Sequence, residues 1–218
     1  MNTVDPETRN VKQKRAYDAS RRRAQAHRNH GRIVEIAERL FLRDGFAPTT
    51  IAAIAAEAGV SVDTIYKSFG GKAGLVRAIR SRALEGEGRV PAERRSDELH
   101  AQQTDARAIV RAWGALSAEV APRVSPILLL IRDAAATNAE GRKLLEELDA
   151  DRLRRMTDNA HRLRDAGHLR EGVTLARAAD VLWTYSSPEL YELLVLRRGW
   201  TPTDYGEFVA EAMVDALV

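Results

Sequence analysis

The chain has 218 residues, a length that suits one large domain or two smaller ones. Hydrophobic residues make up 44% of it, which is enough to bury a core and excludes wholesale disorder. There is no cysteine, so disulfides, thiolate metal sites and cysteine nucleophiles are excluded. No apolar run approaches the roughly 20 residues of a membrane span, and the N-terminus is polar and basic rather than signal-like. We therefore expect a cytoplasmic protein that is not held in a membrane.

The charge is unevenly distributed, although the net formal charge is only +3. Residues 1–83 carry 16 Lys and Arg against 8 Asp and Glu, whereas residues 84–218 carry 18 against 23. A basic first part on a mildly acidic remainder indicates a polyanionic partner for the first part. A basic disordered tail would explain a share of the same excess.

The first elements in chain order are a polar arm and four helices. Residues 1–27 form a basic arm with few apolar residues. Apolar residues at three- and four-residue spacing predict a helix over 28–43. Capping residues and glycines then predict helices over 51–58, 62–68 and 72–84. We expect residues 28–86 to form one domain.

The remainder of the chain is also predicted to be helical. Residues 86–97 read as a domain linker, and 98–218 as a second domain. Its helices are expected at 98–119, 122–137, 139–166, 174–197 and 203–217, with Pro122 at a helix start and Pro188 kinking or splitting the fourth. No period-two strand pattern is present, so the predicted fold class is all-α with about nine helices.

Residues 51–68 have the spacing of a helix-turn-helix. In that unit two short helices cross steeply, so that one lies in the major groove of DNA and the other braces it. Ala55 supplies the small residue at the crossing, Gly59 suits the turn, and Ile65 anchors the second helix from beneath. The sequence therefore predicts a DNA-binding domain.

A wider set of residues resembles the signature of the TetR (tetracycline repressor) family. It covers about 45 positions: Ile33 to Ala37, Leu40, Phe41, Gly45, Phe46, Thr49, Thr50, Ile54, Ala55, Ala58 to Ser61, Thr64 to Tyr66, Phe69, Lys72 and Leu75. The stretch from Trp183 to Trp200 also looks similar to the last helices of many members. The resemblance implies a homodimer that binds double-stranded DNA and a small-molecule ligand.

The resemblance also implies which residues touch DNA. Hydroxyl groups and a lysine at helix starts suit phosphate oxygens, although Thr50 and Ser61 can be plain caps, Tyr66 a packing residue and Lys72 a solvated lysine. The recognition helix departs from the family pattern, because it begins with Val62 and Asp63 rather than with a cation. The predicted DNA-contacting set is Thr50, Ser61, Val62, Asp63, Thr64, Tyr66, Lys67 and Lys72.

Asp63 has two interpretations, since a carboxylate can read cytosine or simply favour a helix N-terminus. Because the reading helix has few cations, we expect residues 9–28 of the basic arm to add backbone or minor-groove contacts. Nothing in the sequence indicates an enzyme: no phosphate loop, hydrolase elbow, metal-ligand spacing or cofactor motif is present.

The second domain is richer in apolar and aromatic residues than a minimal scaffold needs. Core and dimer interface explain most of them, and a largely apolar pocket with a few polar anchors is the sharper hypothesis. The candidate pocket residues are Trp113, Leu130, Arg132, Met156, Asn159, His161, Trp183 and Tyr185.

The resemblance implies pairing of the last helices across a two-fold axis and a roughly palindromic operator. Apolar stripes there include Leu175, Ala178, Ala179, Leu182, Leu190, Leu193, Leu194, Phe208, Ala212, Val214 and Leu217. The expected function is a repressor that a ligand releases from DNA through the helix 72–84. The alternative is an architectural, sequence-tolerant DNA-binding protein without a ligand.

Overall fold

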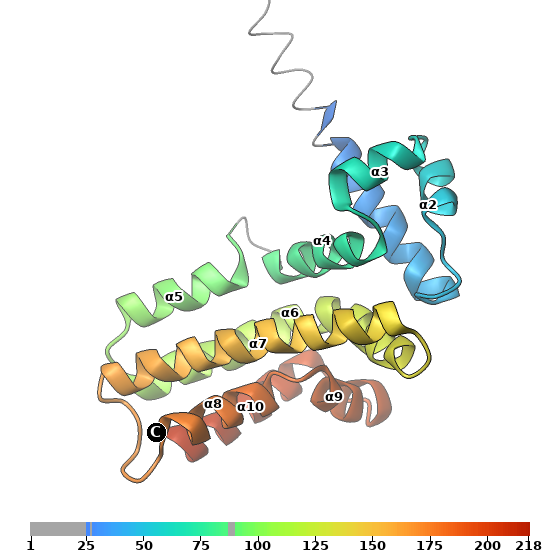
Figure 1. The fold of residues 1–218 in the computed structure, drawn as a ribbon. Coiled ribbons are helices and arrows are strands. Elements are labelled where there is room, and N and C mark those ends of the chain that lie inside the picture. The colour runs from blue at the N-terminus through green and yellow to red at the C-terminus, as the bar shows by residue number, and fades with distance from the viewer. Residues whose placement is uncertain (1–24, 27, 87–89) are drawn as a thin grey trace, which may run out of the picture.

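The computed structural model describes residues 25–26, 28–86 and 90–218, and among them helices are the regular elements, with no strand (Figure 1). The expected all-α fold class is thereby confirmed. The predicted basic arm, apart from residues 25 and 26, lies outside the described residues. So do residues 87–89 of the predicted linker.

The N-terminal unit consists of a helix over residues 28–44, α2 (Ile51–Ala58), α3 (Val62–Phe69) and α4 (Lys72–Glu85). These bounds agree closely with the predicted ones. Thr50 caps α2 by accepting a hydrogen bond from the Ala53 amide at 3.1 Å, and Ser61 caps α3 through the Thr64 amide at 3.1 Å. Figure 1 shows this unit at one end of the molecule, with α4 leading away from it.

The sequence misplaced the next boundaries. α5 (Ala92–Gln102) lies half inside the predicted linker 86–97, since Pro91 fixes an extended conformation directly before it and starts a helix. The helix predicted over 98–119 is wrong, because α5 ends at Gln102. A new helix begins after Asp105, whose carboxylate accepts from the Arg107 amide at 3.0 Å.

α6 (Ala106–Ala135) runs through both Pro122 and Pro126, so the predicted helix start at Pro122 is wrong. Each proline removes one helical hydrogen bond. Burial on both sides of the prolines, for example Ala121, Ser125 and Ile127, overrides that cost. By length and composition α6 could cross a membrane, and among the described residues it packs against α4, α5, α7, α9 and α10.

The remaining elements are α7 (Ala139–Asp165), α8 (Leu175–Tyr185), α9 (Pro188–Tyr191), the π-helix η1 (Glu192–Arg197) and α10 (Pro202–Leu217). Pro188 splits the predicted helix 174–197, as expected, because it occupies the first position of α9. Thr201 and Asp204 form a capping box at the start of α10. α7 packs beside both α6 and α8, and α10 packs along α6 (Figure 1).

Two hydrophobic clusters organise the described residues. The first joins the helix-turn-helix and α4 to one end of the α6–α7 pair, through Ile127, Ile131, Leu144 and Leu148. The second fills the space between α6, α7, α8 and α10. The N-terminal unit therefore shares a hydrophobic core with α6 and α7 and is not joined to them by a linker alone.

Gly114 and Gly206 mark the closest approach of α6 and α10. A Cβ at Gly114 would lie 2.5 Å from the Ala210 Cβ, and one at Gly206 would lie 2.5 Å from the Ala118 Cβ. Both distances are far below van der Waals contact, so no side chain fits at either position. The two helices are held together at a separation that only glycine permits.

Candidate DNA interface and ligand cavity

The turn between α2 and α3 has the geometry that the sequence predicted. Gly59 adopts φ +66°, a left-handed conformation that favours glycine. Ala55 is 3% exposed at the helix crossing, and Ile65 is fully buried beneath α3. The Val60 amide donates to the Ala55 carbonyl at 3.0 Å and closes the end of α2.

The outer face of α3 is free of packing, as a reading face must be. Tyr66 is 53% exposed and Val62 is 41% exposed, so the interpretation of Tyr66 as a packing residue is not supported. Lys67 and Asp63 form an exposed ion pair at 2.7 Å, one turn apart. The one lysine on this helix is therefore already paired, which lowers its surplus positive charge.

Lys72 has internal partners. Its ammonium donates to the carbonyls of Phe46 and Ala47 at 2.8 and 3.2 Å, and it lies 4.5 Å from the centre of the Phe46 ring. Lys72 thus ties the start of α4 to the loop before α2. The interpretation of Lys72 as an ordinary solvated lysine is therefore not supported. Its ammonium group has a third N–H, which remains available for a phosphate oxygen.

A cavity of about 160 Å³ lies between the helices of the second domain. The sequence placed Trp113, Met156 and Asn159 in a ligand pocket, and all three line this cavity. The helices around it are α4, α5, α6, α7, α8, α9 and α10. Other lining residues include Leu84, Leu116, Val120, Val124, Leu128, Leu182, Pro188, Tyr205 and Met213.

Several polar atoms in the cavity wall are buried without a hydrogen-bond partner among the described residues. They are the indole N–H of Trp113, the amide oxygen of Asn159 and the hydroxyl of Ser96. These side chains are 6%, 5% and 7% exposed. A buried polar group left unpaired costs about 1–3 kcal/mol, so together they provide unused donors and an acceptor for a ligand. Burial also raises the pKa of Tyr205 to about 12, which keeps its phenol neutral.

Residues 33–79 match the family model described as bacterial regulatory proteins, tetR family. This part of the chain matches the TetR family. The match runs from the first helix into α4 and includes the buried turn and the exposed α3 described above. It agrees with the resemblance seen in the sequence and with the expectation of a non-enzymatic DNA-binding protein.

A curated member of the family matches the same part of the chain. The chain is 44% identical over 59 residues to the HTH-type transcriptional regulator TtgR of Pseudomonas putida. That match covers 27% of this chain and 28% of TtgR, so the chain aligns with just over a quarter of its relative's length.

Two solved structures share the fold over most of the chain. Native NalD of Pseudomonas aeruginosa, described as the secondary repressor of the MexAB-OprM multidrug efflux pump, superposes with a TM-score of 0.70 at 20% identity, covering 89% of this chain and 98% of NalD. The SmeT–triclosan complex superposes at 0.65 with 23% identity, covering 87% and 91%. At these identities the likeness shows a common all-helical fold.

Five of the predicted pocket residues lie outside the cavity wall. Trp183 lies under the guanidinium of Arg152 at 4.6 Å, and Tyr185 meets the edge of Phe208. Leu130 packs against the cluster that contains the helix-turn-helix core. Arg132 takes part in ion pairs, and His161 is half-buried on α7.

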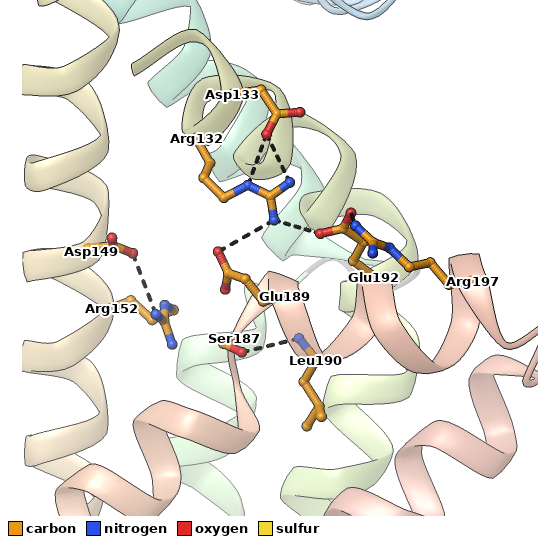
Figure 2. A network of polar contacts seen from close by, with 9 residues as sticks. All are labelled: Arg132, Asp133, Asp149, Arg152, Ser187, Glu189, Leu190, Glu192 and Arg197. Atoms are coloured by element: carbon orange, nitrogen blue, oxygen red, sulfur yellow. Dashed lines mark hydrogen bonds and ion pairs between the residues drawn. The ribbon is translucent and has the colours of Figure 1, made fainter. Parts of the chain in front are cut away.

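Arg132 ties the end of α6 to the π-helix η1 (Figure 2). Its guanidinium donates to Glu192 at 2.6 Å and to Asp133 at 2.9 Å, and Glu192 also accepts from Arg197 at 2.6 Å. These bonds hold η1 against the helix that carries the cavity. The sequence signal for Arg132, a cation beside an apolar face, was real, but the partner is a carboxylate of the same chain.

The Arg132–Glu192 pair should make the free energy of unfolding depend on pH. The hydrogen bonds from Arg132 and Arg197 lower the pKa of Glu192 from 4.5 to about 2. When the pKa of a carboxylate is lower in the folded state than in the unfolded state, the ionised group stabilises the fold. This stabilisation is fully present above the unfolded-state pKa and is lost as the pH falls toward the folded-state pKa. The unfolding free energy of the wild type should therefore exceed that of Glu192→Gln by a constant amount above about pH 5, and the gap should narrow between pH 4.5 and 2.

Urea unfolding from pH 7 to 3 measures this gap. The exposed Glu207→Gln on α10 serves as the matched control and should show no such trend. A gap between wild type and Glu192→Gln that stays the same across this range would contradict the assignment.

Proposed function

We propose that the protein is a cytoplasmic, dimeric transcriptional repressor that binds a palindromic operator through α3 and is released by a small molecule. The observation that carries this proposal is the double role of α4. Leu75, Val76 and Ile79 are fully buried in the helix-turn-helix core, while Arg80 and Leu84 of the same helix line the cavity. A ligand that shifts α4 therefore moves the hydrophobic core that supports the recognition helix.

Ion pairs also hold α4 to both neighbours. Arg82 bonds Glu38 of the N-terminal helix at 2.7 Å, and Arg77 bonds Glu147 of α7 at 2.5 and 2.7 Å. The coupling that results is reciprocal, because a ligand that weakens operator binding must itself be weakened by the operator to the same degree. The names of the NalD and SmeT structures, a repressor and a ligand complex, support this mode of action.

The dimer is proposed to form on the outer side of η1 and α10. Leu193 and Leu196 are 51% and 56% exposed, and Phe208 is 38% exposed beside Trp200. Large exposed apolar side chains on two adjacent elements support a protein contact there. In contrast, the small residues that the sequence suggested for this interface, Ala178 and Ala179, are buried within the protomer.

The experiment that tests this function is fluorescence anisotropy with the DNA upstream of the protein's own gene, against a scrambled sequence of equal length. A specific regulator is expected to prefer its operator by a factor of at least about 10³. Equal binding to the native site, to sites selected from random DNA and to the scrambled control would favour the architectural alternative instead.

The basic arm supports a second prediction about the same interface, although it lies outside the described residues. Each phosphate contact contributes about 0.9 to the slope of log K against log salt. Deleting residues 1–24, which hold seven Lys and Arg, should flatten that slope by several units. Replacing Arg21, Arg22 and Arg23 with glutamine should flatten it less. An unchanged slope in the deletion would show that the arm does not contact DNA.

A further inference from the structure

Three guanidinium groups line the cavity, and they come from two helices. Arg80 belongs to α4, while Arg152 and Arg155 belong to α7. The lining contains a single carboxylate, that of the exposed Glu93. The other lining side chains are uncharged, so this is a marked excess of positive charge for a site between helices.

The three arginines differ in how well they are paired. Arg155 is well satisfied, since it donates to Asp97 at 2.7 Å and to the Glu93 carbonyl at 2.9 Å. Arg152 reaches the Asp149 carboxylate only at 3.5 Å (Figure 2) and otherwise donates to the Trp183 carbonyl and to Ser186. Arg80 has no hydrogen bond or ion pair with any of the residues that the structure describes.

Arg80 and Arg152 also act on each other. Burial is the main cause that lowers the pKa of Arg152, and the charge of Arg80 lowers it further. Both guanidinium groups line the same cavity, and their charges are poorly compensated, because Arg80 has no carboxylate partner among the described residues and Arg152 has only the distant one of Asp149. An anion between them would relieve both the repulsion and the missing hydrogen bonds.

The apolar part of the cavity limits the size of what it holds. Leu116, Val124, Leu128 and Met213 face a volume of about 160 Å³. An apolar cavity of about 150 Å³ accepts a benzene-sized guest. The enclosed part of the site therefore fits a single ring or an equivalent short apolar body. The unpaired donors and acceptor of Trp113, Ser96 and Asn159 add places for a further polar substituent.

We propose that the releasing ligand is a small organic anion, whose ring fills the apolar cavity and whose carboxylate is bound between Arg80 and Arg152. This rests on the proposed ligand-released function and names the class of its ligand. Since Arg80 belongs to α4, its attraction to the anion moves the helix that packs against the helix-turn-helix. Binding of the charged group, rather than of the ring, is then the step that weakens operator binding.

The test compares 4-ethylbenzoate with 4-ethylbenzamide, which have the same shape and differ in charge. Calorimetry on the full-length protein should give a carboxylate preference of about tenfold or more, the size expected of a charge-assisted hydrogen bond. Arg80→Gln should bring the two affinities within about threefold of each other, and Arg80→Lys should keep part of the preference. Arg177→Gln, an exposed arginine of α8 outside the cavity, is the control and should keep all of it.

The same protein is titrated with operator DNA in parallel, so that the two proposals can fail separately. Release of operator by the benzoate, and not by the amide, is the expected result. Equal binding of the two probes would overturn the anion assignment, and so would a preference that survives in Arg80→Gln or the failure of both probes to bind. In each of these cases the operator titration alone decides whether the protein is a specific DNA-binding regulator.

Discussion

Replacing Gly114 with valine is expected to lower the free energy of unfolding by about 3 kcal/mol, at the upper end of the usual cost of overpacking. A Cβ at this position would lie 2.5 Å from the Ala210 Cβ and 2.7 Å from the Gly206 carbonyl oxygen. Neither atom can move without shifting the α10 backbone away from α6. Because α10 also borders the cavity and the proposed dimer face, the variant should lose cooperative unfolding as well as stability.

Gly31→Ala is the matched control, because a side chain added there meets open space. Gly31 lies in the N-terminal helix, and a Cβ on it would have no heavy atom within 4 Å. Alanine in a helix interior should stabilise the protein by roughly 0.5–1 kcal/mol relative to glycine. Urea unfolding followed by circular dichroism measures both variants. Equal and small changes would mean that α6 and α10 do not approach as closely as described.

Loss of the Tyr66 and Thr64 side chains should weaken operator binding by about 100-fold. Both side chains are exposed on the outer face of α3, where a helix that enters the major groove presents its contacts. A hydrogen bond from a hydroxyl group to a charged phosphate oxygen contributes about 1.5–3 kcal/mol, so the double substitution to alanine removes a large share of the affinity. Anisotropy with operator and scrambled DNA measures the loss.

Three comparisons make the Tyr66 result specific. Tyr66→Phe separates the hydroxyl from the ring and should cause a smaller loss than Tyr66→Ala. The melting temperature should stay unchanged, because Tyr66 is 53% exposed and supports no core. Leu153→Ala, a similarly exposed apolar residue of α7, should leave operator binding as it is. Full affinity in the Thr64 and Tyr66 double variant would place the reading face elsewhere.

The DNA-binding end was predictable from sequence because its determinants are local. Caps at Thr50 and Ser61, the left-handed Gly59 and the buried Ile65 all act within about one helix turn of their own position. The bounds of α2, α3 and α4 were correspondingly close. The split at Pro188 was predictable for the same reason, since a proline fixes its own backbone.

The second domain was less predictable because distant contacts decide it. Pro122 reads as a helix start in isolation, yet packing on both sides carries α6 through it. The sequence also predicted that helix 72–84 transmits the ligand signal, but it did not predict Arg80 and Leu84 of that helix as cavity residues. The signal that could have found Arg80 and Leu84 is that this helix has a second face, on which Arg80 follows directly after the buried Ile79.

The dimer interface shows a further limit of sequence patterns. Ala178, Leu182, Val214 and Leu217 form apolar stripes that suit a partner as well as a protomer core. The structure buries all four within the protomer. Periodicity shows that a helix face is buried, but what covers the face depends on the arrangement of helices far apart in the chain.

The proposed function requires that two recognition helices, held by a dimer, read two half-sites of one operator. The chain has no cysteine, so Ser68→Cys at the exposed end of α3 gives each protomer a single spin label. On operator DNA, the distance between the two labels should form one narrow distribution near the spacing of successive major grooves, about 34–36 Å. The absence of any label–label coupling on DNA, or a broad distribution that operator does not narrow, would contradict the account.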